Sequence, residues 1–265
     1  IREINAPGLD LWGFVLSSVC LAALVSGFES LGRGLMPIWM QVGLLVLGFG
    51  CGALYVRHSR RVEHPIIDLS LLRIPTFSIS TLGGNLCRFT VGGTPFLLAM
   101  LLQVGFGLSP FQAGMITFAS AAGAMLMKFV ATPIVLRFGF RRVLMINAVL
   151  TGLFVMACAT FTPDTPGWLM IVILLIGGFF RSLQFTGVNT LAYADIAPER
   201  MSSASSFSAM AQQLGITLGV GVAAVSLNIS MSVRGGEHLV VGDVIVGFLV
   251  VGVACLLSVF SFRRL

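Results

Sequence analysis

Long runs of apolar residues, separated by short polar stretches, follow one another along the whole chain. An α-helix needs about 20 apolar residues to cross a bilayer, and the sequence contains eight runs of about that length or slightly longer. They cover Leu11–Phe28, Met36–Val56, Phe77–Val104, Phe111–Leu136, Val143–Phe161, Trp168–Leu191, Ser205–Ile229 and Val241–Phe262. Because backbone groups cannot stay unpaired in lipid, we predict an all-α integral membrane protein in which each run is one continuous transmembrane helix.

The polar stretches differ in length and divide the chain into three parts. The short, glycine-rich loop Glu29–Leu35 joins the first two runs, which predicts a transmembrane hairpin within residues 1–56. Residues 57–76 form the longest stretch, where Pro65 and Pro75 bound the amphipathic segment IIDLSLLR. We expect a cytoplasmic linker here, with a short helix on the inner membrane surface. The other six runs have short connections, which favours a six-helix bundle over residues 77–265.

Composition and charge support this picture. Hydrophobic residues make up 57% of the chain and charged residues 10%, whereas soluble domains carry about 25% charged residues. Eleven of the basic residues fall on one side of the predicted spans, against Arg33 and Arg234 on the other. The eleven are Arg2, Arg57, Arg60, Arg61, Arg73, Arg137, Arg141, Arg142, Arg200, Arg263 and Arg264. This positive-inside bias predicts a multi-pass inner-membrane protein with both ends in the cytoplasm. It explains the net charge of +6 without a nucleic-acid partner.

Three cations lie inside the predicted spans: Arg88, Lys128 and Arg181. Each costs about 2.5–3.5 kcal/mol at the centre of a bilayer. Helical spacing puts Arg88 on one polar stripe with Asn85 and Gln103, and puts Arg181 in line with Gln184. Such mixed stripes are typical of a cavity wall. Our candidates for a substrate cavity are Asn85, Arg88, Gln103, Arg181, Gln184 and Asn189.

Structural interpretations of the same residues stay open. Lys128 is about two turns from the end of its run, so it could reach the interface by snorkelling. Arg88 and Arg181 could instead hold helix pairs together. Gly215 and Gly219 form a GxxxG pattern that favours close helix packing.

The sequence contains no pattern of an intramembrane enzyme. Acidic residues lie near span ends, the three histidines lie in loops, and HExxH, nucleophile-elbow and phosphate-loop motifs are missing. The five cysteines are scattered through the apolar runs without CxxC spacing, so we interpret them as small buried hydrophobic residues. We therefore expect no enzyme, no metal and no cofactor.

The segment PIVLRFGFRR between the fourth and fifth runs resembles the second copy of the loop motif GxLaDRxGRR of the major facilitator superfamily. Arg137, Gly139 and Arg141 match its R-x-G-x-R core, and Arg142 follows. Thr132 and Leu136 stand where the motif has glycine and an acid, so an acid-centred gate is not expected here. Glycine permits the tight turn, and arginines hold such a loop at an anionic membrane face.

Four further stretches are similar to the fourteen-helix drug:proton antiporter branch of that family (EmrB/QacA type). They are HPIIDLSLLRIPTF, GLSPFQAG, RSLQFTGVNTLAYADIAPERMSSASS and QQLGITLGVGVA. The resemblance implies a two-helix hairpin followed by the C-terminal six-helix bundle, with the N-terminal six helices and their coupling acids missing. It implies proton-coupled efflux of amphipathic drug-like molecules by alternating access. We expect the loop Arg137–Arg142 to serve as an orientation and gating clamp. Its expected partners are Asp195, Glu199 and Arg200, because the next cytoplasmic loop lies on the same side.

Two alternatives remain beside this interpretation. The same fold could export a metabolite, a siderophore or a lipid. Alternatively, a half-length chain could have a structural role and transport nothing alone.

Overall fold

The computed structural model describes residues 10–33, 36–62, 65–236 and 238–265. Arg2 and His64, which entered the charge and histidine arguments, lie outside the described residues. In the described part all regular structure is helical, and seven helices are long and apolar enough to cross a membrane. These seven are Leu11–Ser30, Ile38–Ser59, Pro75–Gly105, Phe140–Thr160, Gly167–Ala192, Pro198–Arg234 and Val241–Phe262. The chain is therefore a multi-pass membrane protein.

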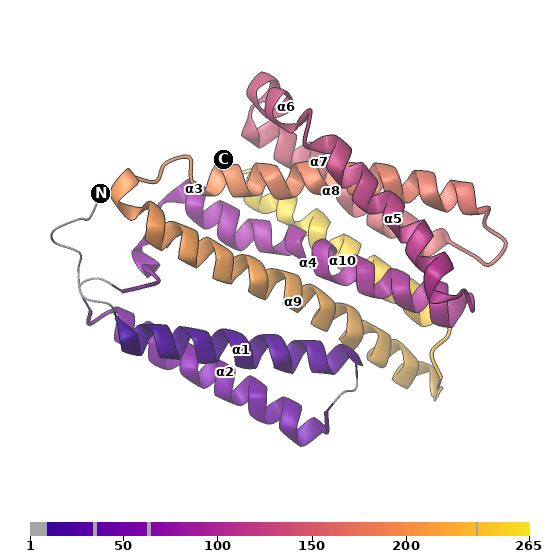
Figure 1. Cartoon of the computed structure of the whole chain (residues 1–265), viewed down its shortest axis with the longest axis horizontal. Helices are drawn as coiled ribbons and strands as arrows, with labels where there is room; N and C mark the ends of the chain where they lie inside the picture. The colour runs from indigo at the N-terminus through magenta and orange to yellow at the C-terminus, as the bar shows by residue number, and fades with distance from the viewer. Residues whose placement is uncertain (1–9, 34–35, 63–64, 237) are drawn as a thin grey trace.

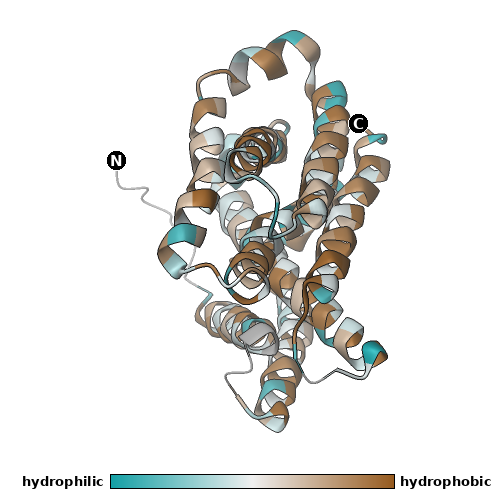
Figure 2. Cartoon of the chain, turned by 90° about the vertical axis from the view of Figure 1, so that its right-hand side faces the viewer, coloured by the Kyte–Doolittle hydropathy of each residue, from teal (hydrophilic) through white to brown (hydrophobic). Residues whose placement is uncertain are grey.

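The helices run roughly along one axis, with the hairpin of α1 and α2 on one side of the others (Figure 1). The main helices are α1 (Leu11–Arg33), α2 (Ile38–Ser59), α4 (Gly84–Ala99), α5 (Pro110–Met127), α6 (Ala131–Phe138), α7 (Phe140–Ala157), α8 (Gly167–Ala192), α9 (Met201–Arg234) and α10 (Val241–Phe262). The short helix α3 (Pro75–Ser78) and two π-helical turns, η2 (Ile79–Gly83) and η3 (Met100–Gly105), extend α4 at its two ends. Brown, hydrophobic colour covers most of the helices, and teal gathers mainly near their ends (Figure 2).

Local sequence signals explain several helix ends. The Ser109 hydroxyl accepts from the Gln112 amide at 3.3 Å, and the Gln112 side chain accepts from the Ser109 amide at 3.1 Å, which caps α5. The Asp10 carboxylate accepts from the Gly13 amide at 2.8 Å and caps α1. Gly235, in the left-handed conformation with φ 68°, ends α9. The bounds of α10 are those predicted, whereas α9 extends beyond the predicted run at both ends.

Glycines bring three helix pairs into close contact. A Cβ at Gly123 of α5 would lie 1.9 Å from the Leu175 carbonyl oxygen of α8, and one at Gly178 of α8 would lie 2.1 Å from the Ser120 carbonyl oxygen. A Cβ at Gly92 of α4 would lie 1.9 Å from a backbone oxygen of α9. Gly152 and Gly252 bring α7 and α10 together in the same way. Small residues at these crossings allow the backbone approach that stabilises helix pairs in membranes.

The fourth predicted span differs from the expectation. Instead of one helix over Phe111–Leu136, the chain forms α5 and then a turn at residues 128–130 before α6. Pro133 explains the break, because a proline has no amide hydrogen and its ring clashes with the carbonyl group four residues earlier. α6 stands apart from the axis shared by the long helices (Figure 1). Neither α5 nor α6 is among the seven helices that meet the length and hydropathy criteria.

Between the hairpin and the remaining helices, the linker docks on the bundle. Its helical part is shorter than the predicted segment, a 3-10 helix η1 (Leu69–Arg73) in which Leu71 is fully buried. Asp68 caps this helix and accepts a hydrogen bond from Arg200 at 2.6 Å. Tyr55 of α2 donates to the Ile67 carbonyl at 3.0 Å and accepts from the Ile67 amide at 2.8 Å. The linker therefore connects the end of α2 with the beginning of α9.

The Asp68–Arg200 pair predicts a pH-dependent contribution to stability. Burial raises the pKa of the Asp68 carboxyl, but hydrogen bonds from Ser70 and the Arg200 guanidinium outweigh it, so the pKa falls below its ordinary value of 3.8. The contribution is complete above pH 3.8 and is lost as the pH falls through the lowered value. Asp68→Asn should lower the free energy of unfolding by about 1 kcal/mol at pH 7. The melting temperatures of the natural protein and of Asp68→Asn should differ less at pH 3 than at pH 7. Asp164→Asn, in an exposed loop, should have the melting temperature of the natural protein at both pH values.

Candidate functional site

Arg88 lies at the centre of the polar contacts between α4 and α8. Its side chain is only 3% exposed. Nη1 donates to the Asn85 side-chain oxygen at 3.0 Å, and Nη2 donates to the Asn189 side-chain oxygen of α8 at 2.8 Å. The structure thus brings together three of the six predicted cavity residues. Both partners are neutral amides, and in the described part of the chain no ion pair joins Arg88 to a carboxylate.

Arg181 makes a separate contact between α8 and α5. Its Nη2 donates to the Ser120 hydroxyl at 2.7 Å. One residue further along α8, the Ser182 hydroxyl donates to the Ala124 carbonyl of α5 at 2.9 Å. Arg181 therefore lies where α5 and α8 cross, and its recorded polar partner is a neutral hydroxyl group.

A buried polar network joins four helices beside Arg88. The Asn147 amide of α7 donates to the Gln184 side-chain oxygen of α8 at 2.9 Å, and Gln184 donates to the Cys87 sulfur of α4 at 3.3 Å. Cys87 also lies 2.9 Å from the Ser258 hydroxyl and 3.8 Å from the Cys255 sulfur, both on α10. Gln184 and Asn147 are each 2% exposed. Of this network only Gln184 was predicted from the sequence. The available signal for the others was the polar residues that recur along α7 and α10.

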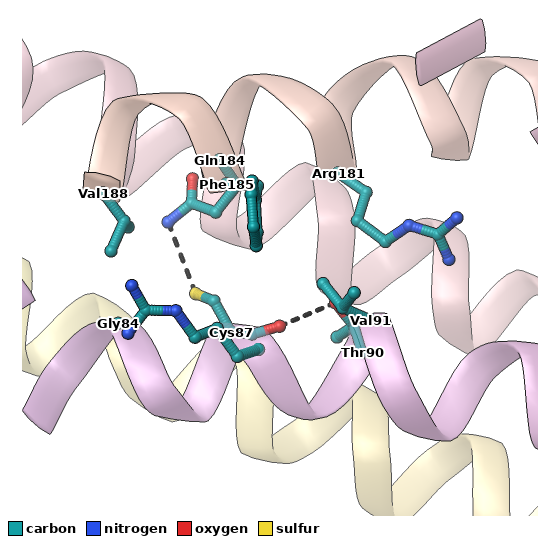
Figure 3. Close-up of a pocket in the computed structure, with 9 residues that line it drawn as sticks. Gly84, Cys87, Thr90, Val91, Arg181, Gln184, Phe185 and Val188 are labelled. Carbon is teal, nitrogen blue, oxygen red and sulfur yellow. Dashed lines mark hydrogen bonds between the residues drawn. The ribbon is translucent and has the colours of Figure 1, made fainter. Parts of the chain in front are cut away.

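A narrow cleft lies between α4 and α8. Its lining residues are Gly84, Cys87, Arg88, Thr90, Val91, Arg181, Gln184, Phe185 and Val188. Gln184 and Cys87 point toward each other across it, whereas the Arg181 side chain points away from them (Figure 3). Arg181 also lines a second cleft, with Thr94, Ser120 and Phe154, so it separates two small spaces within the bundle.

Two predicted residues lie away from this cluster. Gln103 belongs to the same helical stripe as Arg88, but it is exposed in η3, about 22 Å further along at 1.5 Å per residue. Lys128 is exposed in the turn that ends α5, so it is not enclosed within a continuous helix as predicted. The helix break at Pro133 accounts for this difference. Gly215 and Gly219 of α9 lie against Arg88 and Phe89 of α4.

The loop motif joins α6 to α7. Gly139 has φ 76° and ψ 152°, a conformation that favours glycine. Arg137 lies in the last turn of α6, with its guanidinium 5.7 Å from the centre of the Phe138 ring. Arg141 and Arg142 are exposed in the first turn of α7. Two of the three proposed partners make contacts elsewhere: Asp195 accepts from the Thr76 hydroxyl at 2.8 Å, and Arg200 contacts Asp68.

Known proteins give an independent assignment. Residues 81–265 match the family described as Major Facilitator Superfamily. Relatives named "Putative multidrug resistance protein MdtD" are 34% identical over 227 residues, which is 84% of this chain and 48% of the relative. They come from Salmonella heidelberg (strain SL476) and Salmonella paratyphi A (strain ATCC 9150 / SARB42), and a third, from Salmonella typhimurium, is 34% identical over the same length.

The chain spans about half the length of these curated relatives. The family match covers the helices that carry Arg88, Arg181 and the loop motif. The expectation of a membrane transport protein and not an enzyme is confirmed by this assignment. The chain belongs to the Major Facilitator Superfamily.

Proposed function

We propose that the chain is the C-terminal part of a proton-coupled multidrug efflux transporter that works by alternating access. The observation that carries this proposal is the similarity, over 84% of the chain, to relatives named for multidrug resistance. In this proposal α5 and α6 together count as the fourth of eight spans. Residues 1–56 form a hairpin, residues 57–76 a cytoplasmic linker, and residues 77–265 the six-helix C-terminal bundle of an inner-membrane transporter whose segment ends face the cytoplasm.

A second six-helix unit completes the transporter in this proposal. The supporting observation is that the chain accounts for 48% of the length of its relatives. The coupling carboxylates would lie in that unit, and the substrate cavity between the two. Arg88, Asn85, Asn189, Arg181 and Gln184 form or border its wall, and rocking of one bundle against the other exposes the cavity to each side. Gln103 would lie nearer to one end of the substrate cavity.

Transport by everted membrane vesicles tests this function. Vesicles that contain the whole protein encoded by the gene should take up at least one of a panel of amphipathic dyes of either charge, and an uncoupler should stop the uptake. Uptake of metabolites, siderophores or lipids but no dye would reassign the cargo. If the gene upstream of Ile1 encodes no further spans and no compound is transported, the chain has a structural role and the proposal is wrong.

The loop Arg137–Arg142 is proposed to act in conformational cycling and not in substrate binding. Arg141 is exposed at the start of α7, where it can contact another part of the transporter. Arg141→Glu should lower the rate of dye uptake about tenfold while the Kd for the dye changes by less than about twofold, since a charge pair of this kind contributes about 1.4 kcal/mol. Arg264→Glu, an exposed charge reversal at the end of the chain, is the matched control. Equal losses of uptake and binding would argue against gating.

A further inference from the structure

Arg88 is a buried cation whose positive charge is not compensated by the described part of the chain. Its two hydrogen bonds end on the neutral amide oxygens of Asn85 and Asn189. Its Nε is buried and has no hydrogen-bond partner. Burying an unpaired charge is expensive, so buried charges are normally paired. The three ion pairs recorded among the described residues involve Asp10, Asp68 and Asp243, none of them with Arg88.

The neighbouring residues do not supply the missing negative charge. Cys87, Thr90 and Gln184 line the cleft beside Arg88 as neutral groups, and the Thr90 hydroxyl is already directed at the Cys87 carbonyl at 2.7 Å. Arg181 lines the same cleft, but its guanidinium points away and donates to Ser120, and it is a cation in any case. α9 closes the opposite side, where a Cβ on Gly215 would lie 3.2 Å from the Arg88 Cβ. The cleft toward α8 is therefore the open side of Arg88.

The size of the cleft limits what can fill it. Its free space beside Arg88 holds about one water-sized group. A water molecule could accept a hydrogen bond from Nε, but it would leave the charge uncompensated. A large organic anion would not fit between Val91, Phe185 and Val188 as they lie.

We infer that the cleft between α4 and α8 binds the end of one compact monovalent anionic group against Arg88, either a chloride ion or one oxygen atom of a carboxylate. The group accepts from the free Nε and balances the guanidinium charge. This inference concerns binding alone and does not depend on transport. The anionic group has two possible sources, a free ion or a carboxylate side chain from the rest of the protein, and they share one chemistry.

Thermal unfolding of the whole protein in lipid nanodiscs tests the inference and separates the sources. Sodium chloride, formate and gluconate are compared at constant ionic strength. For a free ion, chloride and formate should raise Tm with saturation and the larger gluconate should not. Arg88→Gln should weaken the apparent affinity for chloride about tenfold or more, whereas Arg88→Lys should keep much of it because it keeps the charge. Arg142→Gln, at an exposed arginine, is the matched control with the same change in net charge.

The other outcomes are equally distinct. If no ion changes the Tm of the natural protein, but the lower Tm of Arg88→Gln recovers as the pH falls through the carboxyl range, the anionic group is a side chain of the protein. An equal chloride response in Arg88→Gln, or an equal response to gluconate, would overturn the inference. The inference would also be overturned if Arg88→Gln had the same Tm as the natural protein at every pH and neither protein responded to any of the ions. If Arg88→Gln does not fold, the chloride-35 resonance gives the same decision: the natural protein and Arg88→Lys should broaden it, and an excess of formate, but not of gluconate, should remove the broadening.

Discussion

Replacing Gly123 by alanine should lower the free energy of unfolding by about 2–3 kcal/mol. The added Cβ would lie 1.9 Å from the Leu175 carbonyl oxygen and 3.1 Å from the Phe179 amide nitrogen, both on the backbone of α8. Backbone atoms cannot rotate away as a flexible side chain can, so α5 and α8 must separate. Separation would also weaken the contact between Arg181 and Ser120, which spans the same crossing.

Equilibrium unfolding of the protein in mixed micelles measures this effect. Gly178→Ala should behave like Gly123→Ala, because its Cβ meets the same crossing from the α8 side. Gly114→Ala is the control on α5, since a Cβ there meets no atom within 4 Å; its effect should stay within about 0.5 kcal/mol. Equal stability of the Gly123 and Gly114 variants would show that the two helices do not approach this closely.

Replacing Asp243 by alanine should have an effect of similar size at the other end of the bundle. Asp243 is 1% exposed in the first turn of α10. It accepts from the Ser230 hydroxyl at 2.7 Å, from Arg234 at 3.0 Å and from the Val240 amide at 3.1 Å. Loss of the carboxylate removes three charge-assisted hydrogen bonds, two of them between α9 and α10 and one at the N-cap of α10, so we expect a loss of about 3 kcal/mol in unfolding free energy.

The neutral variant Asp243→Asn separates charge from hydrogen bonding. Its amide oxygen can still accept one or two of these bonds, so it should lose about half as much stability as the alanine variant. The same unfolding measurement at pH 7 applies to both. If Asp243→Ala unfolds like the natural protein, the carboxylate does not hold the two helices together.

Much of the fold could be predicted from hydropathy, because a helix in lipid must satisfy its own backbone hydrogen bonds and so extends through the whole apolar run. The bounds of α10 show this most clearly. The break between α5 and α6 was missed because the apolar run continues through it. Pro133 was the signal, since a proline within a helix ends or bends it.

The candidate site was predictable only in part, for a related reason. Helical spacing identifies which residues share a face, so Asn85 and Arg88 could be paired from the sequence. Helical spacing does not show how far a site extends along that face, and Gln103 lies well beyond the site around Arg88. The contact between Arg88 and Asn189 joins residues 101 positions apart. The partners of Cys87 on α8 and α10 likewise depend on which helices pack together, and periodicity alone does not encode that choice.

The proposal that the cavity bordered by Arg88 and its neighbours faces each side of the membrane in turn is tested most directly by thiol labelling. Val91 lines the cleft beside Arg88 and is partly exposed. Val91→Cys is therefore introduced into the whole protein after all its natural cysteines, including the five of this chain, are replaced by alanine. A membrane-impermeant maleimide is then applied to right-side-out and to everted vesicles, with and without a proton gradient. Alternating access predicts labelling from both sides, with the gradient raising the rate on one side and lowering it on the other. Labelling from a single side, at a rate independent of the gradient, would contradict the account.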